Sequence, residues 1–177
     1  LHCHTIFSDG ELTPEALAAN LAAAGVRYAA LTDHNSLVGL PRFQDALQKR
    51  GVAYLPGVEV TTWFHGREAH LLGYGFDTQH ADLDATLFSL RQARNLEVHS
   101  IASSLRKSGA TRPGGADDPP GISAAPDGWL EVGEAIDLLH RAGGQAFWAH
   151  PLWYESAPAR LDAYVAELKA LGLDGLE

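Results

Sequence analysis

Cysteine is almost absent from this chain, and so are long apolar runs. The one cysteine, Cys3, excludes a disulfide within the chain and fits a reducing compartment, so we expect a cytoplasmic protein. No apolar run approaches the roughly 18 residues that a membrane-spanning helix needs. With 177 residues, 46% hydrophobic and 20% charged, the chain has the composition of one globular domain that can bury a core.

Basic residues are scarce as well. The 13 lysines and arginines are outnumbered by 22 aspartates and glutamates, which makes the formal net charge −9. Binding of nucleic acid over a broad surface depends on a basic face, so this composition argues against it. A phosphorylated substrate remains compatible, because bound cations can reverse the potential of a single site.

Patterns typical of strands and helices alternate along the chain. Thr13 and Pro14 predict the start of a helix, with threonine as its cap, and Gly25 predicts its end. The alternation predicts an α/β fold with a parallel sheet covered by helices. Polar residues at the strand ends favour a barrel, whose chemistry gathers at the C-terminal ends of its strands. The stretch 111–128, rich in proline and glycine, is expected to be a flexible linker.

Seven side chains of metal-binding types lie at or near the ends of the predicted strands. His2 and His4 are two residues apart on the first of these strands, so both face the same way. Histidine with carboxylate suits Zn²⁺, Mn²⁺ or Fe²⁺, and the lack of thiolate clusters argues against a structural zinc finger. Cys3 points to the opposite side and is expected to be a small buried residue. The candidate metal ligands are His2, His4, Asp9, His34, Glu59, His70 and His150.

Each of these signals also has an ordinary structural explanation. A His-x-His pair can be a polar strand edge, Asp33 suits a strand-to-helix turn, and His150 with Pro151 can form a structural turn. Their shared placement at strand ends is what indicates one common site. A carboxylate such as Glu59 can bridge two ions, and ions roughly 3.5–4 Å apart can activate water for a displacement at phosphorus.

The remaining histidines and two arginines are interpreted differently. His65, His80, His99 and His140 fall in turns, loops or helices and are expected to be structural or exposed. Arg91 and Arg94 lie on a predicted long helix. They are either solvated charges or, for Arg94, a bidentate contact for a substrate phosphate.

Taken together, the motifs resemble those of the PHP family, named for polymerase and histidinol phosphatase. They span nearly the whole chain and are specific as a set rather than singly. The small bacterial members that act on nucleotides or on RNA 5′ ends are the most similar in pattern. The matching stretches are Leu1-His2-Cys3-His4-Thr5 with Ser8-Asp9-Gly10, Leu31-Thr32-Asp33-His34, Pro56-Gly57-Val58-Glu59, His70-Leu71-Leu72-Gly73-Tyr74 and Ala142-Gly143-Gly144 through Ala149-His150-Pro151.

This resemblance implies a distorted (β/α)7 barrel of the PHP type that holds two or three divalent ions, Mn, Zn or Fe. It implies that a metal-bridging hydroxide attacks phosphorus, with no catalytic residue beyond the metal ligands and no covalent enzyme intermediate. By the same resemblance, His2, His4 and Glu59 would hold the first ion, Glu59, His70 and His150 the second, and Asp9 and His34 the third.

The chain departs from the family pattern in several places. Members end with an Asp-x-His pair, which does not occur before Glu177, so we expect residues 1–177 to be a PHP phosphoesterase domain truncated at its C-terminal end. A barrel without its last strand exposes an unpaired edge, so we expect these residues alone to be weakly stable or weakly active. The nucleotide-directed members carry an insertion where only the stretch 111–128 stands here. Asn35-Ser36 replaces the usual aspartate and threonine and would alter the support of His34.

We therefore expect a metal-dependent phosphoesterase that acts on phosphomonoesters of nucleotides or of a small metabolite. Exonuclease action on RNA or DNA ends is the enzymatic alternative, and a basic groove would favour it. A non-catalytic PHP module for binding or regulation is the other alternative. Bound metal without phosphate release would favour that module. No membrane partner is expected, and the oligomeric state is left open.

Overall fold

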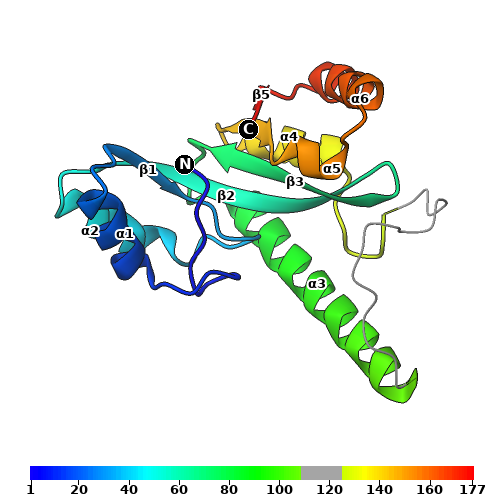
Figure 1. Cartoon of the computed structure of the whole chain (residues 1–177), viewed down its shortest axis with the longest axis horizontal. Helices are drawn as coiled ribbons and strands as arrows, with labels where there is room; N and C mark the ends of the chain where they lie inside the picture. Colours follow the sequence, from blue (N-terminus) through cyan, green and yellow to red (C-terminus); the bar gives the residue numbers. More distant parts are fainter. Residues whose placement is uncertain (109–124) are drawn as a thin grey trace.

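The computed structural model describes residues 1–108 and 125–177 of the chain. The predicted linker at 111–128 lies largely outside these residues. In chain order the elements are α1 (Pro14–Ala23), β1 (Tyr28–Leu31), α2 (Leu40–Gln48), β2 (Ala53–Phe64), β3 (Arg67–Tyr74), α3 (Ala81–Ser108), α4 (Val132–Arg141), β4 (Gln145–Trp148), α5 (Pro151–Tyr154), α6 (Pro158–Ala170) and β5 (Gly175–Leu176) (Figure 1).

The strands form one mixed sheet in the order β1-β2-β3-β4-β5. β1 runs parallel to β2, and β4 runs parallel to β5. β3 runs antiparallel to both of its neighbours. The α/β class is confirmed, but the prediction of an all-parallel sheet is wrong. Closure into a seven-stranded barrel is not observed in the described part of the chain, where β1 and β5 form the two edges of the sheet.

The antiparallel pairing of β2 and β3 follows from the turn at His65 and Gly66. Both residues have positive φ, 48° and 79°. Two-residue turns of this kind match the twist of the strands they join, so they make tight hairpins. The turn connects Phe64 to Arg67, which are partners in the strand register. A parallel pair would need a crossover of a dozen or more residues, for which this connection has no room.

The predicted first strand is also wrong, because residues 1–5 belong to no strand in the described structure. The segment is tied to the end of β1 through one residue. The Thr32 backbone N–H donates to the Cys3 carbonyl at 2.9 Å, and the Cys3 N–H donates to Thr32 Oγ1 at 3.0 Å. The helix expected after it is confirmed: Thr13 Oγ1 accepts from the Ala16 N–H at 3.3 Å and so caps α1.

α4 packs against β2, β3 and β4 on one face of the sheet. Gly73 allows the close approach, because a Cβ there would lie 2.4 Å from Leu139 Cδ2. Val58 and Leu71 point to the same side and are fully buried. Successive strand residues point to opposite faces, so Glu59, Thr61, Glu68 and His70 face away from α4.

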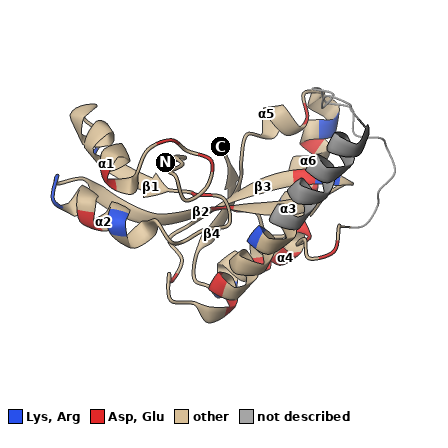
Figure 2. Cartoon of the chain, turned by 90° about the horizontal axis from the view of Figure 1, so that it is seen from below, with Lys and Arg blue, Asp and Glu red and all other residues tan. Residues whose placement is uncertain are grey.

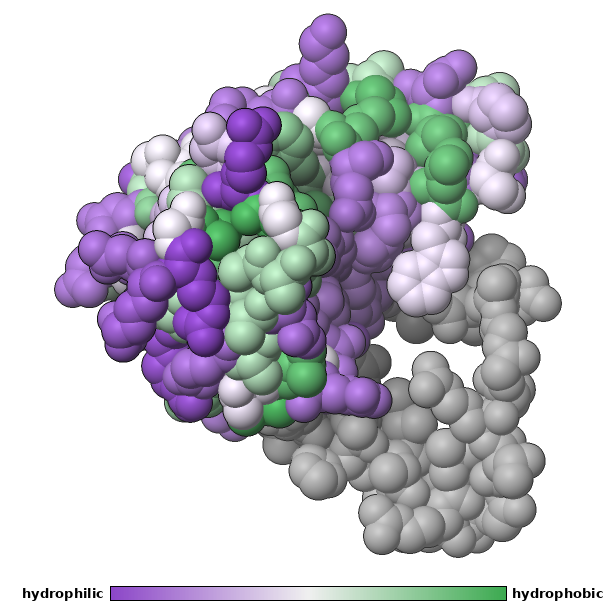
Figure 3. All heavy atoms as spheres, turned by 60° about the vertical axis from the view of Figure 1, so that its left-hand side comes forward, coloured by the Kyte–Doolittle hydropathy of each residue, from purple (hydrophilic) through white to green (hydrophobic). Residues whose placement is uncertain are grey.

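The surface mixes charges of both signs. Figure 2 shows that acidic and basic residues both occur on α2 and α3. On the face shown in Figure 3, apolar areas are interrupted by hydrophilic residues. Among the described helices, none has the length and apolar character required to cross a membrane.

Candidate metal centre

Glu59 lies at the centre of a cluster of five histidines. Its side chain is 1% exposed, and β2 directs it to the face opposite α4. On one side of the carboxylate, Oε2 lies 3.0 Å from His2 Nε2 and 3.1 Å from His4 Nε2. On the other side, Oε1 lies 3.0 Å from His70 Nδ1 and 3.1 Å from His150 Nε2. Each carboxylate oxygen therefore faces its own pair of imidazole nitrogens.

The nitrogens within each pair also lie close to one another. His2 Nε2 is 3.0 Å from His4 Nε2, and His70 Nδ1 is 3.3 Å from His150 Nε2. Two imidazole nitrogens at this distance cannot both carry a proton towards each other, and two facing lone pairs repel unless a cation or a shared proton relieves them. With the carboxylate oxygen beside them, each pair fits the donor set of a divalent transition metal.

Asp9 and His34 form the outer part of the cluster. His34 Nε2 lies 3.4 Å from Glu59 Oε2 and 3.6 Å from Asp9 Oδ2, while Asp9 Oδ1 is 3.5 Å from His4 Nδ1. Asp9 is 67% exposed and is the least enclosed of the seven predicted ligands. Groups close enough to share an ion also include His4, Asp9 and His34, and His34, Glu59 and His70, besides His2, His4 and Glu59.

A buried aspartate positions the segment that carries His2 and His4. Asp33 is fully buried and accepts hydrogen bonds from the Thr5 N–H and hydroxyl, both at 2.6 Å, and from the Ser8 hydroxyl at 2.7 Å. These contacts hold the loop between the two histidines and Asp9 against the end of β1. We expected strand pairing to fix the conformation of the segment that carries His2 and His4. Hydrogen bonds to the Asp33 side chain fix it instead.

Asn35, which follows His34, does not bond to the His34 ring but joins β1 to β2 through Thr61. It has a positive φ of 49°, donates to Thr61 Oγ1 and accepts from the Thr61 N–H, each at 2.9 Å. It thereby ties the end of β1 to β2 two residues beyond Glu59. His34 Nδ1 is buried without a hydrogen-bond partner among the described residues. His34 is therefore held by the hydrogen bonds of the neighbouring Asn35 side chain rather than by a bond to its own Nδ1.

The electrostatics of the cluster favour positive charge at its centre. Burial opposes ionisation of Glu59, but hydrogen bonds from His150, His2 and His4 hold the pKa of its carboxyl well below the usual range. Burial also disfavours the charged form of His70, yet hydrogen bonds to Glu59 and Glu68 raise its pKa to about 9. Burial lowers the pKa of His34 to about 4. The anionic carboxylate thus attracts a cation, and an ion held by neutral imidazoles can supply that charge.

Two carboxylates that the sequence analysis did not identify, Glu68 and Glu177, contact the ring nitrogens of His70 and His2 that face away from Glu59. Glu68 precedes His70 by two residues on β3, so both point to the same face, and its Oε1 lies 2.7 Å from His70 Nε2. Glu177 Oε1 lies 2.9 Å from His2 Nδ1, and its Oε2 accepts from the His150 N–H at 2.9 Å. The spacing of Glu68 from His70 could have revealed it, whereas only the fold places Glu177 beside His2.

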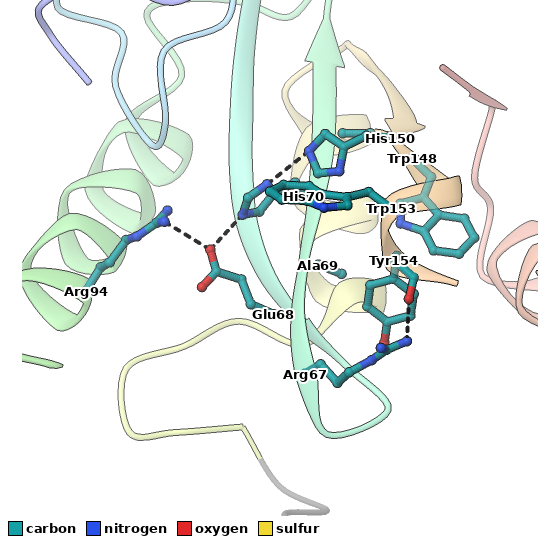
Figure 4. Close-up of a pocket in the computed structure, with 10 residues that line it drawn as sticks. Arg67, Glu68, Ala69, His70, Arg94, Trp148, His150, Trp153 and Tyr154 are labelled. Carbon is teal, nitrogen blue, oxygen red and sulfur yellow. Dashed lines mark hydrogen bonds and ion pairs between the residues drawn. The ribbon is translucent and has the colours of Figure 1, made fainter. Parts of the chain in front are cut away.

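Arg94 lies on α3 at the border of two pockets that reach the cluster. It contacts Glu68 Oε1 at 3.2 Å and donates to Thr61 Oγ1 at 3.1 Å. Figure 4 shows the resulting series of contacts from Arg94 through Glu68 and His70 to His150. Arg91 donates to the Ser36 hydroxyl at 3.0 Å.

The two pockets differ in their walls. One, of about 330 Å³, lies beside His70 and His150 and is walled by aromatic residues of β4 and α5. The other, of about 320 Å³, lies beside Asp9 and His34, with Phe7 and Arg91 in its wall. Arg94 lines both. A ligand in either pocket can therefore contact this guanidinium and the candidate metal ligands at once.

Three of the remaining histidines lie away from the cluster. His65 Nε2 is 2.8 Å from Glu167 Oε2, and His140 Nε2 is 2.8 Å from Asp174 Oδ2. His80 Nδ1 accepts from the Leu83 N–H at the start of α3. These are the structural or exposed roles that the sequence predicts for them. The side chain of His99 lies outside the described residues.

Comparison with known proteins places the chain among metal-dependent phosphoesterases. A family model described as the PHP domain matches residues 1–104. A 5′-3′ exoribonuclease of Haemophilus influenzae is 30% identical, in an alignment that covers 100% of this chain and 77% of the relative. A 3′,5′-nucleoside bisphosphate phosphatase of Chromobacterium violaceum is 29% identical, with 100% of this chain and 75% of the relative covered.

Solved structures share the fold. An amidohydrolase from Chromobacterium violaceum, determined with bound sulfate, matches with a TM-score of 0.84 and 26% identity over 99% of this chain and 74% of its own. A protein from Bifidobacterium adolescentis, proposed to be a metal-dependent phosphoesterase, matches with a TM-score of 0.73 and 23% identity over 99% of this chain and 75% of its own. The mixed sheet is thus shared with solved proteins.

Proposed function

Because this chain belongs to the PHP domain family and is a metal-dependent phosphoesterase, we propose that it hydrolyses phosphomonoesters of nucleotides. The observation that carries the proposal is the arrangement around Glu59, whose two oxygens each face a separate pair of histidine nitrogens. The Chromobacterium relative, a nucleoside bisphosphate phosphatase, supports nucleotides as the substrate class. The non-catalytic module is set aside, since the family evidence supports an enzyme.

We assign the ligands of the ions on the same geometry. The first ion would take the Oε2 side of Glu59, and the second the Oε1 side. A third would lie at the outer edge of the cluster, where only Asp9 and His34 remain. The proposed sets are His2, His4 and Glu59 for the first ion, Glu59, His70 and His150 for the second, and Asp9 and His34 for the third.

Bound divalent ions supply an activated water and neutralise phosphate oxygens during attack at phosphorus. The protein residues hold and orient the reacting groups. Glu59 stays ionised because its histidine partners stabilise the charged form. Arg94, at the border of both pockets, can donate two parallel N–H groups to a phosphate. Glu68 accepts from His70 Nε2 and so directs Nδ1 towards Glu59.

Metal analysis combined with phosphate release from a substrate panel tests the proposal. The protein is loaded with Mn²⁺, Zn²⁺ or Fe²⁺ and assayed on nucleoside monophosphates, nucleoside 3′,5′-bisphosphates, histidinol phosphate, an aryl phosphate and 5′-phosphorylated oligonucleotides. We expect release from nucleotides with at least one metal. Metal-loaded protein that releases phosphate only from histidinol phosphate or the aryl phosphate would refute the nucleotide assignment.

Exoribonuclease action is a second candidate, because the Haemophilus influenzae relative and those of Salmonella typhimurium and Escherichia coli are 5′-3′ exoribonucleases. The net charge of −9 does not favour a long nucleic-acid track, but one terminal nucleotide can be bound without it. Chain-length analysis of a 5′-phosphorylated RNA separates the candidates. A ladder of shortened RNA indicates an exoribonuclease, and an unshortened RNA that has lost its 5′ phosphate indicates a phosphatase.

Arg94→Ala is expected to raise KM for the preferred nucleotide roughly tenfold or more, because a charge-assisted bond to phosphate is lost at a site lined by few other cations. Arg94→Lys should restore only part of this loss, since lysine keeps the charge without the bidentate fork. Steady-state kinetics of the three proteins give the comparison. Arg42→Ala, which removes an exposed partner of Glu15, is the matched control and should change nothing. Equal KM in Arg94→Ala and wild type would show that Arg94 does not contact the substrate.

Glu68→Gln is expected to weaken metal binding about 10–100-fold, because a carboxylate that accepts from a ligating histidine orients it and increases its basicity. Competition with a chromogenic chelator measures the metal dissociation constant. Glu167→Gln serves as the control, since Glu167 also pairs with a histidine at 2.8 Å but at the surface. Unchanged metal affinity in Glu68→Gln would mean that Glu68 does not position His70.

A further inference from the structure

The pocket beside His70 and His150 contains more aromatic surface than a metal site requires. Its far wall is formed by Trp148, Trp153 and Tyr154 (Figure 4). Trp148 is 1% exposed and belongs to the core, whereas Trp153 is 84% exposed. A pocket that is lined by aromatic side chains beside a few polar groups is typical of a site that binds a small ligand, and Trp153 is the aromatic residue in it that solvent reaches.

We propose that Trp153 is the stacking surface for the base of the nucleotide whose phosphate lies at the metal centre. This inference rests on the proposed function and identifies the residue that would distinguish a nucleotide from other phosphomonoesters. Stacking on an aromatic ring tolerates every base, because every base has a π-face. The site should therefore prefer nucleotides over base-free phosphates while accepting all bases.

The chain fixes Trp153 close to the metal ligands. His150 has a left-handed backbone, with a φ of 35°, and the four-residue helix α5 begins at the next residue. The Trp153 backbone N–H donates to the His150 carbonyl at 2.9 Å, and the centroids of the His150 and Trp153 rings are 5.3 Å apart. Trp153 therefore lies next to His150, a proposed ligand of the second ion. A single nucleotide can extend from that ion to the Trp153 ring.

Contacts with Arg67 and Phe64 fix Tyr154, another residue of the pocket wall. The Arg67 guanidinium lies 4.0 Å above the centre of the Tyr154 ring and donates to the Tyr154 carbonyl at 2.7 Å. The Tyr154 hydroxyl donates to the Phe64 carbonyl at the end of β2. The pocket measures about 330 Å³, and its opposite end is Arg94. Its aromatic wall can receive a base, and Arg94 at the other end, which is paired with Glu68, carries a guanidinium that can contact a phosphate.

Two substrates that differ only in the base test the inference. Adenosine 3′,5′-bisphosphate is compared with its analogue in which a hydrogen replaces the base, using metal-loaded wild type, Trp153→Ala and Trp153→Phe. We expect Trp153→Ala to lower kcat/KM for the nucleotide by roughly tenfold, mostly through KM, because base stacking contributes binding of that order. Activity on the abasic analogue should stay within about twofold, and Trp153→Phe should recover most of the loss.

Leu152→Ala is the matched control, since Leu152 is 70% exposed on the same short helix but does not line the pocket. An equal loss on both substrates in Trp153→Ala, or no loss on either, would overturn the inference. A wild type that cleaves both substrates equally would overturn it as well, while leaving the proposed function intact. If no phosphate is released from any substrate, the proposed function fails. Calorimetric titration with the nucleoside bisphosphate then decides the inference: weaker binding by Trp153→Ala than by wild type supports it, and equal binding refutes it.

Discussion

Glu59→Gln is expected to abolish phosphoester hydrolysis, with a loss of roughly 10³-fold or more, because several kcal/mol of transition-state stabilisation depend on the bound ions. Glutamine has the same size, so the packing of β2 should be kept. The change removes the one charge that all five histidines face and leaves an amide nitrogen pointing at one histidine pair. Elemental analysis of the purified variant should show the loss of at least one ion relative to wild type.

The control for this variant is Glu15→Gln, which makes the same chemical change at an exposed ion pair with Arg42. It should retain full metal content and activity. Circular dichroism of both variants shows whether the fold is kept. A folded Glu59→Gln protein with wild-type metal content and activity would refute the role of Glu59 as a bridge between two ions.

Removal and return of metal is expected to change thermal stability as well as activity. A ligand at about 100 times its dissociation constant stabilises the folded state by about 2.7 kcal/mol. For a chain of this size each kcal/mol shifts Tm by roughly 2–4 °C, so chelation should lower Tm by about 5–10 °C. The physical reason is that ions bind the histidine pairs only after β2, β3, β4 and the N-terminal segment have assembled around Glu59.

Calorimetric melts of chelated and metal-reloaded protein give the measurement, with phosphate release assayed on the same samples. Activity should fall to background with chelator and return with Mn²⁺, Zn²⁺ or Fe²⁺. Glu59→Gln, treated in the same way, should show a smaller shift in Tm than wild type. Equal Tm and equal activity with and without chelator would contradict a metal centre in this chain.

The ligand types were predictable from the sequence because their chemistry is local. His2 and His4 could be paired by spacing alone, and Glu59 could be named as a carboxylate able to bridge two ions. The cap at Thr13 followed from preferences of single residues that hold in any fold. Arg94 could be suspected from its charge, but its place at the border of two pockets depends on how α3 packs over the sheet.

Other features could not be derived because they depend on strand direction and register. The hairpin at His65 reverses β3 and makes the sheet mixed, which changes which residues of β3 face Glu59. Asp33 resembled an ordinary turn residue, yet it anchors the loop that carries His4 and Asp9. The spacing of Glu68 from His70 placed both on one face of a strand, but only the fold placed Glu68 beside Arg94. Trp153 gave no signal at all, since exposure is a property of the folded surface.

The sequence by itself determined which donor atoms this protein offers, in what order, and where its first helix begins and ends. Only the tertiary structure decided that two pairs of histidine nitrogens face the two oxygens of one carboxylate. His2 lies 57 residues from Glu59 along the chain, and His150 lies 91 residues from it. Local preferences act over a few residues, whereas contacts at such separations depend on how whole strands pair and pack.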